Sequence, residues 1–115
     1  MTSLGTVIES SAFIAAAERL MSDAERVAVV DMIAAAPDAG AVIKGTGGLR
    51  KLRVALQGRG KRGGARLIYW YHSEGYPALL LTMFAKNEAD DLTAEQLRRF
   101  AAIGGAIIDQ IGARR

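Results

Sequence analysis

Apolar residues recur every three or four positions near both ends of the chain, whereas they alternate with polar residues in its middle. The first spacing is typical of amphipathic helices and the second of half-buried strands. At the N-terminal end, a short strand is expected at Thr6–Glu9. The helical spacing that follows predicts a helix that Ser10 or Ser11 caps and that ends at about Leu20.

Two further helices begin at recognisable caps. Ser22 and Glu25 form a capping-box pattern for a helix that Pro37 ends, so the first two helices form a hairpin. Thr93 and Gln96 repeat the pattern for a final helix, in which a glycine pair at 104–105 suggests close packing against the sheet. The apolar face of this final helix consists of Leu97, Phe100, Ile103, Ile107, Ile108 and Ile111.

The middle of the chain predicts three strands. A glycine-rich connection at Ala39–Gly48 leads to an alternating strand at Leu49–Leu56, a basic turn at Gln57–Gly64, and further strands at Ala65–His72 and Ala78–Ala85. The short turns favour an antiparallel meander. The last strand is apolar throughout and should be buried on both faces. The fold class is therefore α+β: a strand, two helices, a three-stranded antiparallel meander and a C-terminal helix.

The composition excludes several kinds of functional site. The 115 residues form one domain, residues 1–115, which contains no cysteine and a single histidine. A disulfide framework, a thiolate metal site and a multi-histidine metal site are thereby excluded, and no cofactor is expected. The N-terminus lacks the pattern of a signal peptide, and no run of about 18 apolar residues could cross a membrane. We therefore expect a cytoplasmic protein.

Positive charge is concentrated between Ala39 and Ser73. This stretch holds eight Lys or Arg residues, eight of the thirteen glycines and no acidic residue, although the whole chain has a net charge of only +3. Fixed cations attract phosphates, and glycines let backbone N–H groups approach them. A solvated basic loop is the alternative. The eight cations are Lys44, Arg50, Lys51, Arg53, Arg59, Lys61, Arg62 and Arg66.

Four cations are expected to meet on one side of the sheet. On the strand at Leu49–Leu56, Lys51 and Arg53 lie on the face opposite the apolar residues, and an antiparallel meander brings Arg66 and Lys86 toward them. Mutual repulsion makes such a group costly unless an anion neutralises it. The four residues are therefore a candidate anion-binding group.

Other motifs are weaker. GRGKRG at 58–63 fits G-x-G-x-x-G but precedes a strand, which argues against a dinucleotide site. His72 stands alone and is expected in a strand or at the surface. Tyr69, Trp70 and Tyr71 are expected mainly in the core and sheet, with a stacking contact to a nucleobase as the alternative for the tyrosines.

Three segments resemble the HigB-like branch of the RelE toxin superfamily: GTGGLRKLRV (45–54), GRGKRGGARLIYWY (58–71) and LLTMFAKNEADDLT (80–93). The resemblance covers nearly the whole chain. It implies a toxin of a type II toxin–antitoxin system that cuts mRNA on the ribosome. It also implies a helix-turn-helix antitoxin as partner, alongside the ribosome and mRNA.

The resemblance also assigns roles. Lys51 and Arg53 match active-site cations, Arg66 matches the arginine that contacts the scissile phosphate, and Lys86 matches a further functional cation. RelE has a catalytic tyrosine near its C-terminus, whereas residues 89–100 here contain none, so the acid stays unassigned, with Tyr69 or Tyr71 as candidates if either points to the open face. Lys51 or Lys86 is the candidate base.

RNA or ribosome binding is expected from residues beside this group. They are Arg50, Arg59, Lys61, Arg62, Tyr69 and Tyr71. Two other functions remain open, namely a non-catalytic nucleic-acid-binding module and a gyrase-directed toxin.

Overall fold

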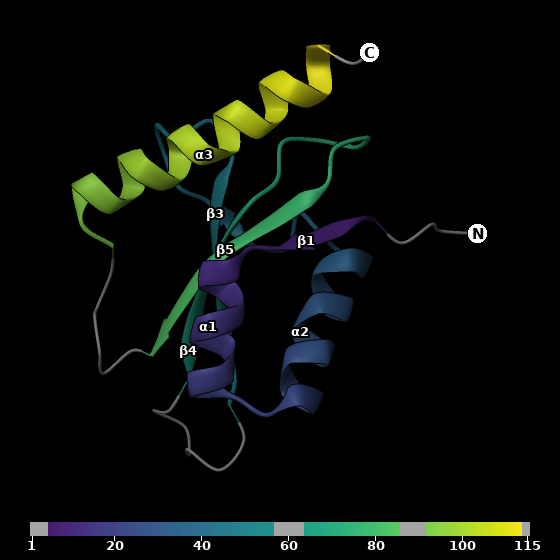
Figure 1. Cartoon of the computed structure of the whole chain (residues 1–115), viewed down its shortest axis with the longest axis vertical. Helices are drawn as coiled ribbons and strands as arrows, with labels where there is room; N and C mark the ends of the chain where they lie inside the picture. Colours follow the sequence, from purple (N-terminus) through teal and green to yellow (C-terminus); the bar gives the residue numbers. More distant parts are fainter. Residues whose placement is uncertain (1–4, 57–63, 86–91, 114–115) are drawn as a thin grey trace.

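Residues 5–56, 64–85 and 92–113 are described by a computed structural model, and they form a five-stranded mixed sheet with helices on both faces (Figure 1). The strand order is β1-β5-β4-β3-β2. The predicted α+β class is confirmed. The elements are β1 (Val7–Glu9), α1 (Ser11–Leu20), α2 (Asp23–Ala35), β2 (Ala41–Val42), β3 (Leu49–Val54), β4 (Ala65–Trp70), β5 (Ala78–Ala85) and α3 (Ala94–Ala113).

The predicted helix caps are all present. The Ser10 hydroxyl accepts the Phe13 N–H at 3.1 Å at the start of α1. Ser22 and Glu25 form the capping box of α2, with donor–acceptor distances of 2.9 and 3.1 Å. The same reciprocal pair of bonds, from 93 to 96, opens α3. Local hydrogen bonding therefore fixes these three helix starts.

Strands β3, β4 and β5 form the predicted antiparallel meander, and two pairings enlarge it. β1 pairs parallel to β5 at one edge, and β2 pairs antiparallel to β3 at the other. The connection at 39–48, which the sequence pattern predicts as irregular, thus contains the two-residue strand β2. Its turn back to β3 is held by Thr46, whose hydroxyl donates to the Ile43 carbonyl at 2.6 Å and accepts the Leu49 N–H at 3.2 Å. Gly45 and Gly47 supply left-handed backbone with φ near 80°.

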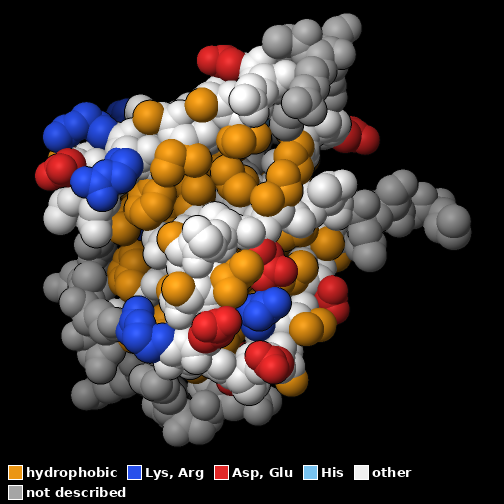
Figure 2. Space-filling view, in the orientation of Figure 1, with side chains coloured by type: hydrophobic (Ala, Val, Ile, Leu, Met, Phe, Trp, Pro, Cys, Tyr) orange, Lys and Arg blue, Asp and Glu red, His pale blue; other side chains and the backbone are white. Residues whose placement is uncertain are grey.

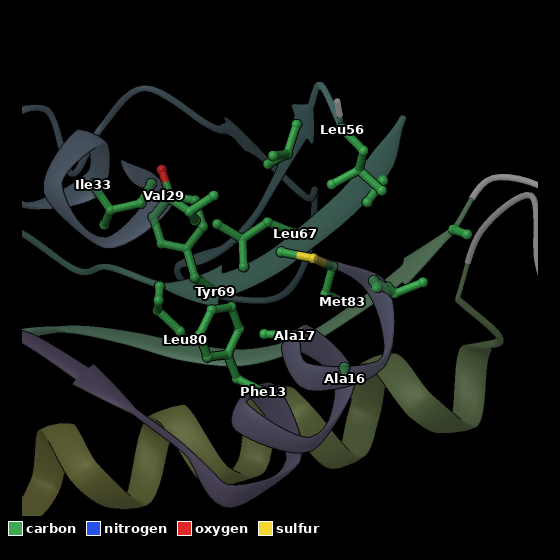
Figure 3. Packing of buried hydrophobic residues seen from close by; sticks show 14 of the residues in the cluster. Phe13, Ala16, Ala17, Val29, Ile33, Leu56, Leu67, Tyr69, Leu80 and Met83 are labelled. Atoms are coloured by element: carbon green, nitrogen blue, oxygen red, sulfur yellow. The ribbon is translucent and has the colours of Figure 1, made fainter. Parts of the chain in front are cut away.

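Each face of the sheet has its own hydrophobic cluster. On one face, α1 and α2 lie side by side and contribute Phe13 and Ile33, which pack against Leu67, Tyr69 and Leu80 of the sheet (Figure 3). The other face packs against α3. That cluster joins Leu49, Ile68, Trp70, Leu79, Leu81 and Phe84 of the sheet to Leu97, Phe100, Ile107 and Ile108 of α3. Figure 2 shows hydrophobic side chains gathered in a band along the flank of α3.

One glycine of α3 is required by its contact with the sheet. A Cβ atom added to Gly104 would lie 2.2 Å from Cδ2 of Trp70, whereas one added to Gly105 would have nothing within 4 Å. Close packing therefore explains Gly104 but not Gly105. The expected apolar face of α3 needs one correction, because Ile103 is 43% exposed. The side chain of Ile111 lies outside the described residues.

A β-bulge in β5 changes which of its residues face α3. The register pairs Ile68 with Thr82 but Tyr69 with Leu80, so Leu81 is an extra residue. Without the bulge, strict alternation from Leu80 would turn Phe84 toward α1 and α2. With the bulge, Phe84 belongs to the cluster on the α3 face.

Candidate nucleic-acid interface

Three predicted catalytic cations share the α3 face of the sheet. Arg53 on β3 pairs directly with Arg66 on β4, and Lys51 pairs with Ile68. Ile68 belongs to the cluster under α3, so alternation places Arg53, Arg66 and Lys51 on that same face. The prediction that these three converge is confirmed. Lys86 lies outside the described residues and stays a prediction.

Arg53 and Arg66 form the type of antiparallel cross-strand pair in which the two side chains lie closer together. The Tyr71 N–H bonds to the Gly48 carbonyl, so even-numbered residues of the β3 segment bond toward β4. Arg53 is odd-numbered, and it therefore opposes Arg66 in a non-hydrogen-bonded pair, the geometry in which side chains approach most closely. Two like charges directly opposite each other destabilise a sheet. The two arginines therefore repel each other in the protein alone, and an anion bound between them would remove this repulsion.

The three cations lie toward one end of β3 and β4, and Trp70 contacts α3 nearer the other end. Arg66 precedes Trp70 by four residues, about 13 Å along β4. Arg53 is exposed, and Lys51 and Arg66 are half-buried. Within the described part of the chain, no acidic side chain forms an ion pair with Arg53 or Arg66. Arg53 thus presents its charge to solvent, whereas Arg66 is only partly exposed.

Phe84 and Thr82 complete this surface, and no sequence pattern indicates a role for either residue. Phe84 lies beside Arg66 in the register, and Thr82 lies beside Ile68. Phe84 is only 9% exposed, so it forms an apolar floor next to the guanidinium. Thr82 is half-buried and brings a hydroxyl to the same face. The β5 bulge determines both positions, and hydropathy alternation alone does not detect it.

Tyr69 is a core residue, as mainly expected, and its burial corrects the alternative prediction that it contacts RNA. Its ring is 0% exposed and lies among the core residues under α1 and α2, with its hydroxyl directed toward α2 (Figure 3). The hydroxyl donates to the Pro37 carbonyl at 2.8 Å and accepts the Gly40 N–H at 2.7 Å. Burial raises the pKa of Tyr69 above its usual 10.0. The phenol therefore stays neutral and fastens the segment before β2.

Arg50 and Tyr71 also lie away from the cationic face. The Arg50 guanidinium donates to the carbonyls of Asp38 and Gly40, at 3.1 and 2.8 Å, and lies 5.6 Å from the centre of the Tyr71 ring. Tyr71 packs against the cluster on the α1 and α2 side. Neither tyrosine therefore meets the condition for acting as the acid, a side chain on the open face. Arg50 acts as a clamp on the same backbone segment that Tyr69 holds.

Other expectations have different outcomes. Arg59, Lys61 and Arg62 lie outside the described residues, so their binding role stays a prediction. His72 is exposed, as expected, and its ring contacts that of Tyr76 at 4.9 Å. Where the chain is described, no three His, Cys, Asp or Glu side chains gather to hold a metal ion. No described helix combines the length and hydrophobicity needed to cross a membrane.

A sheet that carries two opposed arginines and a lysine on one face has the charge that favours binding of a polyanion. A comparison with known protein families identifies the class to which the chain belongs. Residues 11–112 match the family model described as the RelE toxin of the RelE/RelB toxin–antitoxin system, and the chain belongs to that family. It is thus a toxin of a toxin–antitoxin pair, and its partner is an antitoxin. The HigB-like branch stays a prediction.

Proposed function

We propose that this toxin is a ribosome-dependent endoribonuclease that cuts mRNA during translation. Toxins of its family are generally endoribonucleases. The observation that supports this role most strongly is the Arg53–Arg66 pair, two arginines that face each other across neighbouring strands, one exposed and one half-buried. A phosphodiester placed between them would remove the repulsion that the empty pair carries.

The proposed reaction is a transesterification within the RNA. The ribose 2′-oxygen attacks the adjacent phosphorus and forms a new P–O bond, while the bond from phosphorus to the 5′-oxygen of the next nucleotide breaks. One proton leaves the 2′-hydroxyl and one reaches the departing 5′-oxygen. The products are a 2′,3′-cyclic phosphate and a 5′-hydroxyl end. The atoms balance without any co-reactant.

Arg66 and Arg53 would stabilise the charge that accumulates on the phosphate. Arginine presents a planar fork of donors and does not act as a base, so these two residues are suited to charge stabilisation and not to proton transfer. Phe84 would strengthen the interaction, because a buried apolar side chain next to Arg66 in the register lowers the local polarity. Lys51 lies on the same face and is the proposed proton carrier, together with Lys86.

The ribosome would supply much of the positioning. The described cationic face contains no tyrosine from β4 and no histidine, so strong acid–base groups are lacking among the residues described there. Catalysis then depends mainly on orientation and charge, and a bound ribosome orients the mRNA. Arg59, Lys61 and Arg62 would bind the ribosomal RNA. Free RNA should accordingly be a poor substrate.

A reconstituted translation reaction tests the proposal. Arg66→Ala should lower the cleavage rate by about 10²-fold or more, the cost of losing one preorganised charge donor. Arg19→Ala is the matched control, because it removes an exposed arginine of α1 on the opposite face of the sheet, and it should cleave as the unchanged protein does.

Three results would contradict the proposal. The first is efficient cutting of naked RNA without ribosomes, and the second is near-normal cleavage by a folded Arg66→Ala protein. The third is RNA binding with no cleavage at all, which would favour the binding-module alternative. Inhibition of DNA supercoiling in place of mRNA cleavage would favour the gyrase-directed alternative.

A further inference from the structure

Strand β5 contains a single polar side chain. Its sequence is ALLLTMFA, and the seven apolar residues are buried whereas Thr82 is half-buried. The bulge at Leu81 turns Thr82 toward α3, so the threonine lies on the same face of the sheet as Arg53 and Arg66. Among the described residues, none forms a hydrogen bond with the Thr82 hydroxyl. No polar contact inside the described fold therefore explains a threonine at this position.

The α3 face carries two neighbouring rows of side chains across β3, β4 and β5. The first row is Arg53, Arg66 and Phe84, and the second row is Lys51, Ile68 and Thr82. The two rows are two residues apart along each strand, which is about 7 Å. Ile68 is 0% exposed, so Lys51 and Thr82 are the polar groups of the second row. A phosphate held by the arginine pair would thus have the Thr82 hydroxyl one row away.

Thr82 provides a hydrogen-bond acceptor on this face. Ammonium and guanidinium groups only donate hydrogen bonds, whereas a hydroxyl both donates and accepts. Four polar side chains from the described residues of β3, β4 and β5 lie on the α3 face, and all except Thr82 are cations. Phosphate oxygens are acceptors, and the cations suit them. A ligand group that must donate a hydrogen bond therefore finds its partner at Thr82.

RNA offers such a donor next to each phosphate. The ribose 2′-hydroxyl is attached to the carbon beside the one that carries the 3′-phosphodiester, and DNA lacks this hydroxyl. With the phosphate between Arg53 and Arg66, the attached ribose can extend along the strands to the second row, about 7 Å away. The sugar would then lie between the Lys51 and Thr82 side chains.

We propose that the Thr82 hydroxyl accepts a hydrogen bond from a ribose 2′-hydroxyl next to the phosphate at the arginine pair, and that Thr82 thereby selects RNA over DNA. This hydrogen bond orients the sugar and transfers no proton, so Lys51 keeps its proposed role as proton carrier. The inference rests on the proposed function, because it needs a phosphodiester between Arg53 and Arg66. It assigns sugar recognition to a residue outside the cationic group.

Binding of short single strands tests this role without any cleavage. The full-length toxin is titrated at low salt with oligoadenylates of about four nucleotides, made as RNA, as DNA and as 2′-O-methyl RNA. The 2′-O-methyl strand keeps the 2′-oxygen but has no hydrogen to donate from it. The NMR shift of the backbone amide at residue 82 gives each dissociation constant. RNA should bind about three- to tenfold more tightly than the other two strands, the effect of one neutral hydrogen bond.

Substitutions at Thr82 separate the hydroxyl from the rest of the side chain. Thr82→Val keeps the shape and should bind all three strands equally, whereas Thr82→Ser keeps the hydroxyl and should retain the preference for RNA. Urea unfolding should show Thr82→Val to be as stable as the unchanged protein, because no hydrogen bond of the described fold is lost.

Two further variants serve as controls. Arg66→Ala should weaken the binding of all three strands and leave their ratio unchanged, because a guanidinium contacts the phosphate that the strands share. Ser73→Ala removes a hydroxyl from the turn after β4, where Ser73 contacts His72, so it should change neither the affinities nor their ratio.

Several outcomes would overturn the inference. Equal binding of RNA and DNA by the unchanged protein would do so, as would a preference for RNA that survives in Thr82→Val or no binding at about millimolar strand. Equal weakening of all three strands in Thr82→Val would show that the hydroxyl contacts a base and not the sugar. None of these results decides whether mRNA is cut on the ribosome, because the reconstituted translation reaction measures cleavage separately.

Discussion

Replacing Gly104 by alanine should destabilise the protein, although alanine is the better helix former. The added Cβ would lie 2.2, 2.3 and 2.7 Å from three atoms of the Trp70 ring system, and the nearest of these is about 1.2 Å short of the 3.4 Å at which ordinary contact begins. Because Trp70 is 5% exposed and packed in the cluster under α3, it cannot turn away freely. Either the helix or the ring must move.

The magnitude follows from two opposing effects. Overpacking a close contact costs about 1–3 kcal/mol. Alanine in place of glycine inside a helix returns about 1 kcal/mol. Gly104→Ala should therefore lower the free energy of unfolding by as much as about 2 kcal/mol. Gly105→Ala is an ideal control, because it has the same helix effect with no atom within 4 Å, and it should raise the free energy by about 0.5–1 kcal/mol.

Urea unfolding followed by tryptophan fluorescence measures the free energy of unfolding of both variants. The chain contains one tryptophan, so the emission of the folded protein reports directly on the ring that Gly104 touches. The emission should change in Gly104→Ala and stay unchanged in Gly105→Ala. Equal effects of the two substitutions on stability, or an unaltered Trp70 emission in Gly104→Ala, would refute the proposed close packing of α3 on β4.

Three further predictions concern other parts of the molecule. Tyr69→Phe should lower the free energy of unfolding by about 1–3 kcal/mol, because it leaves two backbone groups without a partner. Burial raises the pKa of Tyr69 above 10.0, so the neutral phenol stabilises the fold below about pH 10. This stabilisation is lost as the pH rises further and the phenol ionises. The decrease in the free energy of unfolding at alkaline pH should therefore be smaller in Tyr69→Phe. Ser22→Ala should cost about 1 kcal/mol in thermal unfolding, and an unchanged midpoint would show that the α2 capping box contributes nothing. Neutralising Arg59, Lys61 and Arg62 together should weaken ribosome binding and flatten its salt dependence, while single-turnover cleavage at saturating ribosome changes much less; a collapse of that rate at unchanged affinity would contradict a binding role.

Local signals predicted much of the fold. The serine and threonine caps fixed the helix starts because their hydrogen bonds involve neighbours in sequence. Alternation placed Lys51 and Arg53 on one face of β3, since both residues belong to a regular strand. The same regularity in β4 brought Arg66 opposite Arg53. These predictions succeeded where one element alone determines the answer.

Predictions that depended on pairing between distant segments failed or could not be made. β2 is two residues long, and its existence depends on its partner β3. The β5 bulge reverses the alternation that would otherwise bury Phe84 on the wrong face. The residue types of Arg50 and Tyr69 suggest contacts with RNA, yet both side chains hold the segment at 37–40 through hydrogen bonds to its backbone. A backbone partner some ten to thirty residues away leaves no pattern in the sequence.

The most direct test of the proposed nuclease is to induce the protein in cells and map the new 5′ ends of mRNA. The unchanged protein should produce cuts inside translated reading frames, with 5′-hydroxyl ends, and Arg66→Ala should produce almost none while Arg19→Ala matches the unchanged protein. Cuts spread equally over translated and untranslated RNA, or an Arg66→Ala pattern equal to that of the unchanged protein, would contradict ribosome-dependent cleavage at the arginine pair.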